Sequence, residues 1–181
     1  LLCIGEMGIA NTTVASAIYY ALYGGHPEDW VGAGTGVDEA GLQRKVDCIN
    51  AALALHGDAL KTPAQVLRCV GGRELAAMAG AMARARQLRI PVILDGFICC
   101  AAALCLVRTA LGALDHCVAG HLSAESGHRR LLGAMDKEPL LELNLRLGEG
   151  SGACLAINIL RGALACHNGM ATFAEAGVAA G

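Results

Sequence analysis

The chain has 181 residues, of which 55% are hydrophobic, 17% charged and 3% aromatic, and its formal net charge is −2. This length predicts one domain with a sizeable core of small and aliphatic side chains. The small net charge, without a run of Lys or Arg, argues against a nucleic-acid-binding surface. Because it has 24 glycines and only 4 prolines, the chain is typical of an α/β protein with glycine-rich turns rather than of a disordered protein.

Predicted strands and helices alternate from the first residue. LLCIGEMG is expected to be a short strand that enters a turn, and NTTVASAIYYAL is expected to be the helix after it. A glycine-rich loop, HPEDWVGAGTGVDEAG, leads to a second helix around residues 42–53, where apolar residues recur on one face. VLRCVGG is predicted to be a strand that ends in paired glycines. An amphipathic helix around residues 75–85 follows it.

The second half of the chain continues this alternation. The apolar stretch 91–107 is interrupted by Asp95-Gly96, so it is too short to span a bilayer and predicts a buried strand, a turn and a buried helix. HCVAGHLS, another expected strand, leads into the helical segment SGHRRLLGAM.

The last part of the chain returns to the same edge less regularly. PLLELNLRLGEGSG precedes an apolar helical stretch, ACLAINILRGALA, and the tail MATFAEAGVAAG is expected to be a short helix or a loosely held end. Continuous apolar strands that alternate with helices predict a parallel sheet with helices on both faces, a Rossmann-like three-layer α/β fold. In such sheets ligands bind beyond the carboxyl ends of the strands, where the glycine turns are expected to lie.

The nine cysteines do not form a disulfide or zinc pattern. Their number is odd, there is no C-x-x-C pair, and most of them lie within apolar runs. We therefore expect buried thiols that act as small hydrophobic residues in a reducing cytoplasm, and no metal site.

Two glycine-rich turns carry groups suited to a phosphorylated ligand. In the turn that starts at Gly5, backbone N–H groups at a helix start attract anions, and Glu6 can accept a hydrogen bond from a sugar hydroxyl. The second turn, Gly32–Gly36, is followed by Lys45, and glycine amides with one lysine suit a phosphate. A plain loop with a solvated lysine is an equally good interpretation of the second turn.

Two further turns follow the later strands. Asp95 opens a buried helix, so its carboxylate is either a helix cap or a ligand for a hydroxyl group. Ser123, Glu125 and His128 resemble a hydrolase trio, but without a G-x-S-x-G elbow they do not predict a nucleophilic serine. Ser123 is better interpreted as a hydrogen-bond donor to a phosphate or carboxylate. The turns together predict a site for a nucleotide or a sugar phosphate.

One acid, Glu149, lies between two glycines in the segment LNLRLGEGSGACLA. Glycines at 148, 150 and 152 allow unusual backbone conformations and the close approach of a ligand. By spacing alone, Glu149 is either a capping or solvated residue or part of a site.

Seven ordered blocks resemble one enzyme family. They are GEMGIANTT, VGAGTGVDEAGLQRK, VGGRELAAMAGAM, IPVILDGFICCAAAL, SGHRRLL, EPLLELNLRLGEGSGACLA and MATFAEAGV. In order and spacing they resemble the nicotinate-nucleotide–dimethylbenzimidazole phosphoribosyltransferases, from residue 1 to about residue 177. The resemblance covers the carboxy-terminal part of the family's length, roughly half, and implies an α/β nucleotide-binding catalytic domain over residues 1–165. Residues 166–181 would then belong to the family's smaller helical domain.

The resemblance implies transfer of phosphoribose from nicotinate mononucleotide to 5,6-dimethylbenzimidazole. The products are α-ribazole 5′-phosphate and nicotinate, in assembly of the lower ligand of cobalamin. Glu149 matches the family's catalytic base, for which apolar surroundings would raise the carboxyl pKa towards neutrality. No metal or cofactor is implied. The expected partners are these small molecules and a second copy of the chain in a homodimer, with no nucleic acid and no membrane.

The resemblance also implies roles for other site residues. Glu6 and Gly8 would contact the ribose and the nucleotide backbone, and Leu147 would pack on the benzimidazole ring. The remaining substrate-binding positions fall into three groups: Gly34 and Lys45 at the phosphate, Asp95 and Gly96 on the ribose or nicotinate side, and Ser123 at the nucleotide. Two alternatives stay open, namely a catalytically incomplete nucleotide-binding or scaffold module, and transfer to a different acceptor base.

Overall fold

The structure is a computed structural model that describes residues 1–32 and 36–178, and within these residues four strands form one parallel sheet. The strands lie side by side in chain order: β1 (Leu2–Ile4), β2 (Val92–Leu94), β3 (Cys117–Ser123) and β4 (Pro139–Leu145). The register between β3 and β4 shifts between His121 and Ser123. This sheet confirms the predicted α/β class and brings the carboxyl ends of all four strands to one edge.

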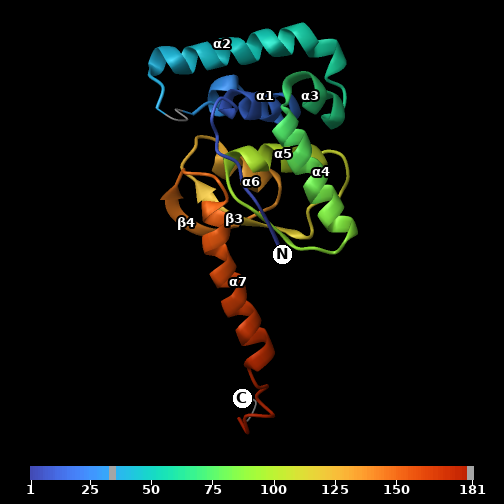
Figure 1. The fold of residues 1–181 in the computed structure, drawn as a ribbon, viewed down its shortest axis with the longest axis vertical. Coiled ribbons are helices and arrows are strands. Elements are labelled where there is room, and N and C mark those ends of the chain that lie inside the picture. The colour runs from blue at the N-terminus through green and yellow to red at the C-terminus, as the bar shows by residue number, and fades with distance from the viewer. Residues whose placement is uncertain (33–35, 179–181) are drawn as a thin grey trace.

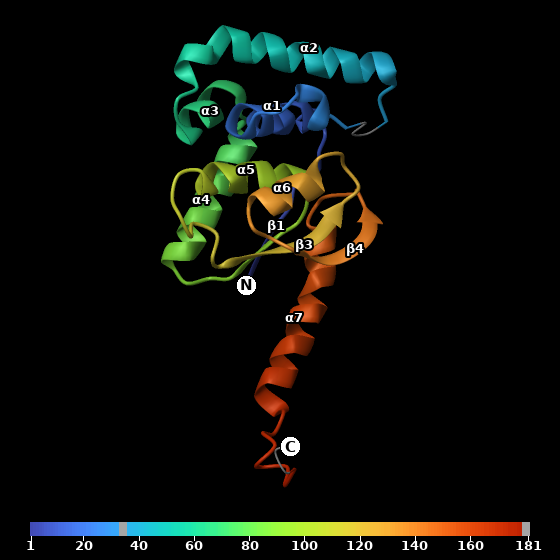
Figure 2. The ribbon, with the colours of Figure 1, turned by 180° about the vertical axis from the view of Figure 1, so that it is seen from behind.

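Helices connect the strands and lie on both faces of the sheet. They are α1 (Thr12–Tyr23), α2 (Glu39–His56), α3 (Pro63–Val70), α4 (Arg73–Gln87), α5 (Phe97–Val107), α6 (His128–Ala134) and α7 (Ser151–Gly169), with short 3₁₀ turns at Pro27–Asp29 and Gly57–Ala59. One face carries a thick stack, in which α5 packs against α1, α4 and α6, and α2 lies outermost on α1 (Figures 1 and 2). On the opposite face, α7 starts against the sheet and then projects away from it (Figure 1).

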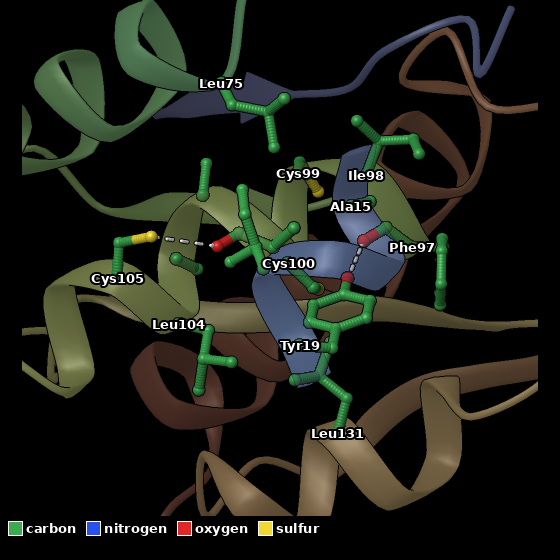
Figure 3. Close-up of a cluster of buried hydrophobic side chains, with 14 of the residues drawn as sticks. Ala15, Tyr19, Leu75, Phe97, Ile98, Cys99, Cys100, Leu104, Cys105 and Leu131 are labelled. Atoms are coloured by element: carbon green, nitrogen blue, oxygen red, sulfur yellow. Dashed lines mark hydrogen bonds between the residues drawn. The ribbon is translucent and has the colours of Figure 1, made fainter. Parts of the chain in front are cut away.

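Helix α5 forms the centre of the core because it is apolar on every side. All residues from Phe97 to Cys105 are buried. Figure 3 shows that Tyr19 of α1, Leu75 of α4 and Leu131 of α6 reach this helix from three directions, and the Tyr19 hydroxyl donates a hydrogen bond to the Phe97 carbonyl. The predicted strand, turn and helix within residues 91–107 are therefore confirmed.

No helix in the described part of the chain is both long enough and apolar enough to cross a membrane.

The predicted strand VLRCVGG is wrong, because Val66 and Val70 lie in helix α3. Thr62 caps this helix by accepting the N–H of Gln65 at 3.2 Å, and Pro63 occupies its first turn, where its missing N–H is not needed. The two valines are four residues apart and both are buried, which is a helical spacing. The paired glycines at 71–72 consequently join α3 to α4, away from the carboxyl edge of the sheet where they were expected.

The prediction of buried thiols holds for only some of the cysteines. Burial raises the pKa of Cys105 and of Cys117 to about 11. However, Cys48, Cys154 and Cys166 are exposed, because they lie on outward faces of α2 and α7. All nine are free thiols: four buried (Cys99, Cys100, Cys105, Cys117), two half-buried (Cys3, Cys69) and three exposed (Cys48, Cys154, Cys166).

Helix α7 packs on the sheet with one face of its first three turns. Gly152, Ala153 and Ala156 are buried there, and Ala153 and Ala156 pack against Ile93 of β2. From residue 158 onwards its residues are exposed or half-buried, and the helix passes without a break through the predicted domain boundary between residues 165 and 166. Residues 170–178 form no helix, and within them Thr172 and Glu175 cap each other in a turn.

Candidate active site

A cleft opens at the carboxyl edge of the sheet. Its walls come from the ends of β1, β2 and β3, the start of α1 and the segment between β4 and α7. Six of the predicted site residues lie in this cleft: Glu6, Gly8, Asp95, Gly96, Ser123 and Leu147. Segments more than 140 positions apart in the sequence therefore meet around one space, as the parallel topology requires.

The turn that carries Glu149 is held tightly against the end of β1. Gly148, Glu149 and Gly150 all have left-handed backbones, with φ of 78°, 58° and 79°. The Glu149 N–H donates to the carbonyl of Glu6 at 2.9 Å. A Cβ at Gly148 would lie 2.3 Å from that same carbonyl oxygen, and one at Gly5 would lie 2.1 Å from the Gly150 nitrogen. The glycines therefore allow a close backbone contact here, and the turn is fixed rather than loose.

Asp95 connects the end of β2 to the start of α7. Its Oδ2 accepts the N–H of Gly150 at 3.0 Å, and its Oδ1 accepts the N–H of Ala153 at 2.9 Å. The side chain is 1% exposed. These two bonds make the carboxylate a cap of α7 and not of α5, the helix that follows Asp95 directly.

His121 of β3 lies next to this carboxylate and also lines the cleft. Its Nδ1 is 3.5 Å from Asp95 Oδ1, and the ring is 1% exposed. Burial lowers the pKa of His121, although the nearby Asp95 opposes this effect. A Cβ at Gly152 would lie 1.9 Å from Nδ1, and one at Gly96 would lie 3.3 Å from Cε1, so the ring occupies space that both glycines leave open.

Lys45 reaches the start of α1 from helix α2. Its Nζ donates to Thr12 Oγ1 at 3.2 Å and to the Gly32 carbonyl at 2.9 Å, and Thr12 lines the cleft. Burial lowers the pKa of Lys45, and the charge of Glu125 partly offsets that effect. The structure therefore places a cation beside the helix start that was predicted to bind an anion. The other predicted phosphate ligand, Gly34, lies outside the described residues.

Ser123 and His128 do not form a hydrolase pair. His128 Nδ1 accepts the backbone N–H of Ser123 at 2.8 Å, and Nε2 lies 3.4 Å from Cys100 Sγ in the core. Burial lowers the pKa of His128 to about 3, with a smaller contribution from His121. The Ser123 hydroxyl instead accepts the N–H of Glu125 at 3.3 Å. This imidazole therefore holds the backbone and activates no hydroxyl group.

Glu149 and Leu147 are exposed in this structure. The described residues thus do not provide the apolar surroundings that were expected around Glu149. Its neighbour Gly148 lines the cleft, so the acid stands at the rim.

Arg146 is a cleft residue that the sequence patterns did not indicate. It follows β4 directly, lines the cleft and lies 3.6 Å from Glu125, measured from Nη2 to Oε1. The available signal was its place as a cation among leucines, two residues before the Gly148 turn. Across the described residues, no group of three or more His, Cys, Asp or Glu side chains is arranged to hold a metal ion.

Comparison with known proteins agrees with the resemblance seen in the sequence. A family described as phosphoribosyltransferase matches residues 1–178. The nicotinate-nucleotide–dimethylbenzimidazole phosphoribosyltransferase of Ruegeria sp. (strain TM1040) is 66% identical over all 181 residues, and that of Jannaschia sp. (strain CCS1) is 65% identical. These matches cover 53% and 54% of the two relatives, so the chain spans about half of their length.

A solved structure has the same fold. The crystal structure of CobT from Thermus thermophilus is similar with a TM-score of 0.93 and 48% identity, over 99% of this chain and 54% of that one. At this identity the likeness extends beyond the arrangement of strands and helices to the sequence itself.

Proposed function

The chain belongs to the family of nicotinate-nucleotide–dimethylbenzimidazole phosphoribosyltransferases, and on that premise we propose that its protein transfers phosphoribose from nicotinate mononucleotide to 5,6-dimethylbenzimidazole. The products are nicotinate and α-ribazole 5′-phosphate, in assembly of the lower ligand of cobalamin. The observation that carries the proposal is the fixed turn that holds Glu149 at the rim of the carboxyl-edge cleft.

The cleft supplies groups for the phosphate and the ribose of the donor. Lys45 provides a positive charge next to the Thr12 hydroxyl and the first turn of α1, where backbone N–H groups also favour an anion. Glu6 offers a carboxylate to a ribose hydroxyl from the end of β1, and Gly8, Gly96 and Ser123 line the same cleft. We assign these residues, together with Gly34, to the nucleotide.

The proposed chemistry is a displacement at C1′ of the ribose. One ring nitrogen of dimethylbenzimidazole forms a bond to C1′ while the bond from C1′ to the nicotinate nitrogen breaks, and its electron pair leaves with nicotinate. Glu149 takes the proton from the other ring nitrogen, so no net charge accumulates on the acceptor base. Attack opposite the leaving group inverts C1′ and gives the α-linked product. The chain's residues supply positioning and a proton acceptor, and no step requires a cofactor.

We further propose that the rim is completed in a homodimer. Glu149 and Leu147 are exposed, and so are Leu155 and Ile159, which lie four residues apart on α7. A covering surface would exclude water around Glu149 and provide the packing for the acceptor base. A cytoplasmic location is in keeping with cysteines that are all free thiols. We keep residues 1–165 as the catalytic domain and assign residues 166–181 to a second, helical one.

The test is nicotinate release, followed by chromatography. The full-length protein is incubated with nicotinate mononucleotide, with and without dimethylbenzimidazole, and compared with its Glu149→Gln and Lys45→Ala variants. We expect release that depends on the acceptor base, a loss of at least about 100-fold in Glu149→Gln with unchanged nucleotide affinity, and roughly tenfold weaker nucleotide binding in Lys45→Ala.

Glu138→Gln is the matched control. Glu138 is exposed just before β4, at the sheet edge opposite the cleft, so its replacement should leave turnover unchanged. Nucleotide binding without any release by the full-length protein would favour a binding or scaffold module. Release with another base alone would favour a different acceptor. Normal turnover in Glu149→Gln would remove Glu149 from its role as the base.

A further inference from the structure

We propose that Asp95 is a positioning residue that fixes the turn carrying Glu149, and that it does not bind the ribose. This inference rests on the proposed function, because it concerns the placement of the base in that reaction. It differs from the role that the resemblance suggests for Asp95, which is direct contact with substrate.

Both carboxylate oxygens of Asp95 already accept hydrogen bonds. Oδ2 accepts the N–H of Gly150, the residue directly after Glu149, and Oδ1 accepts the N–H of Ala153 one turn further along α7. His121 Nδ1 also lies 3.5 Å from Oδ1. Asp95 lines the cleft but is only 1% exposed, so its carboxylate has little surface left for a ligand.

Few other contacts hold the turn that carries Glu149. On one side, the Glu149 N–H bonds to the carbonyl of Glu6. On the other side, the Asp95 side chain accepts hydrogen bonds from the backbone N–H groups of Gly150 and Ala153. The residue between these anchors is Glu149 itself. Its position over the cleft is therefore set by a backbone contact from β1 and by a carboxylate from β2.

The negative charge of Asp95 suits the start of α7. The first N–H groups of an α-helix have no partner within the helix, and a carboxylate is the acceptor that suits them best. An asparagine in place of Asp95 keeps the shape but presents one N–H₂ group, which would face an N–H donor. It can satisfy one of the two amides and must leave or repel the other. Asp95→Asn should thus loosen the turn without reshaping the cleft.

The experiment separates positioning from binding in the full-length protein. For Asp95→Asn we expect kcat to fall by about 100-fold, the loss typical of a catalytic group displaced by about 1 Å. The dissociation constant of nicotinate mononucleotide, measured by calorimetry without the acceptor base, should stay within threefold. Hydrogen exchange at the amides of residues 149–153 should become at least tenfold faster.

The two proposals fail in different ways. The exchange measurement needs no turnover, so faster exchange would support the positioning role even if the wild-type protein released no nicotinate. Nucleotide binding weakened tenfold or more, with unchanged exchange, would overturn it and make Asp95 a ligand. Unchanged kcat with unchanged exchange would also overturn it.

A second variant disturbs the start of α7 and leaves Asp95 unchanged. Gly152→Ala puts a Cβ 1.9 Å from His121 Nδ1, so the start of α7 must shift. We expect lower kcat, unchanged nucleotide affinity and faster exchange at residues 149–153. Normal kcat in a folded Gly152→Ala protein would contradict the proposal. Thr62→Ala, which removes the cap of α3 away from the cleft, is the control and should change neither kcat nor this exchange.

Discussion

Helices α5 and α7 begin in the same way and are stabilised differently. Each starts at a glycine at the carboxyl edge of the sheet, Gly96 for α5 and Gly150 for α7, and each is rich in apolar residues. α5 is surrounded by other helices over most of its length, whereas α7 packs on the sheet with one face of its first three turns and then extends away (Figure 1). α5 is held by packing on all sides, whereas α7 is held by packing on one side and by a small number of polar and backbone contacts at its start.

The difference shows where this fold is sensitive to change. A substitution in α5 acts on the core as a whole and should change the free energy of unfolding. A substitution at the start of α7 acts on the turn that carries Glu149 and should change the site before it changes the fold. Because few contacts hold that turn, each of them matters more for function.

The largest expected effect on stability is in α5. Leu104→Ala removes a fully buried side chain and should lower the free energy of unfolding by about 3 kcal/mol. Leu155→Ala in α7, where the leucine is 48% exposed, should cost less than about 0.5 kcal/mol. Urea titration of both variants measures the contrast. An equal cost at Leu155 would show that the outer face of α7 is covered in the assembled protein.

Adding a methyl group where β1 meets the start of α7 should also destabilise the protein. Gly5→Ala directs a Cβ to within 2.1 Å of the Gly150 nitrogen, and such overpacking should cost about 2 kcal/mol. Gly80→Ala is the control for a methyl group added without a clash. Gly80 is on the exposed side of α4, and a Cβ there meets nothing within 4 Å. An alanine there should stabilise the protein by about 0.5 kcal/mol. Thermal unfolding distinguishes the two, and a tolerated Gly5→Ala would mean that the contact with the turn is loose.

The stability of the packing around α5 should depend on pH through His128. His128 contacts Cys100 of α5, and its pKa is about 3 in the folded protein against about 6.5 for a free histidine. Between these values only the unfolded chain binds the proton, so this contribution is complete above pH 6.5 and is lost as the pH falls towards 3. From pH 7 to pH 5 the loss is about 2 kcal/mol.

His128→Gln removes that proton uptake, so the difference in unfolding free energy between pH 7 and pH 5 should shrink by about the same amount. Urea titration at the two pH values measures it. His167→Gln, at an exposed position of α7, should leave the difference unchanged. A wild-type slope retained in His128→Gln would show that His128 is not the group responsible.

Local patterns were sufficient to predict most of the fold. The continuous apolar runs at β2 and β3 and the helical spacing in α2 and α4 correspond to the observed elements. The error at α3 arose because a run of valines and a cysteine favours a strand, while Thr62 and Pro63 already signalled a helix start. The sequence also did not indicate that most of α7 is exposed, because an apolar helix has the same pattern whether or not another segment covers it.

The sequence predicted which residues lie at the site better than it predicted the contacts that they make. The strand order brings Glu6, Asp95 and Ser123 to one edge, as expected for a parallel sheet. The role of Asp95 was left open, because its partner amides are 55 and 58 residues away and no local pattern indicates them. The exposure of Glu149 was missed for the same reason, since solvent access depends on distant segments and not on neighbouring residues.

The backbone conformation of the turn formed by Gly148, Glu149 and Gly150 has a consequence for the evolution of this protein. Glu149 has a φ of 58°, a conformation in which a side chain costs energy and glycine does not. A glycine at this position would relieve the strain and lose the carboxylate. Selection for heat resistance alone would therefore favour loss of the acid, and only selection for turnover keeps it. Stabilised libraries of this protein should be screened for activity at every round, because their easiest gain lies at the proposed base itself.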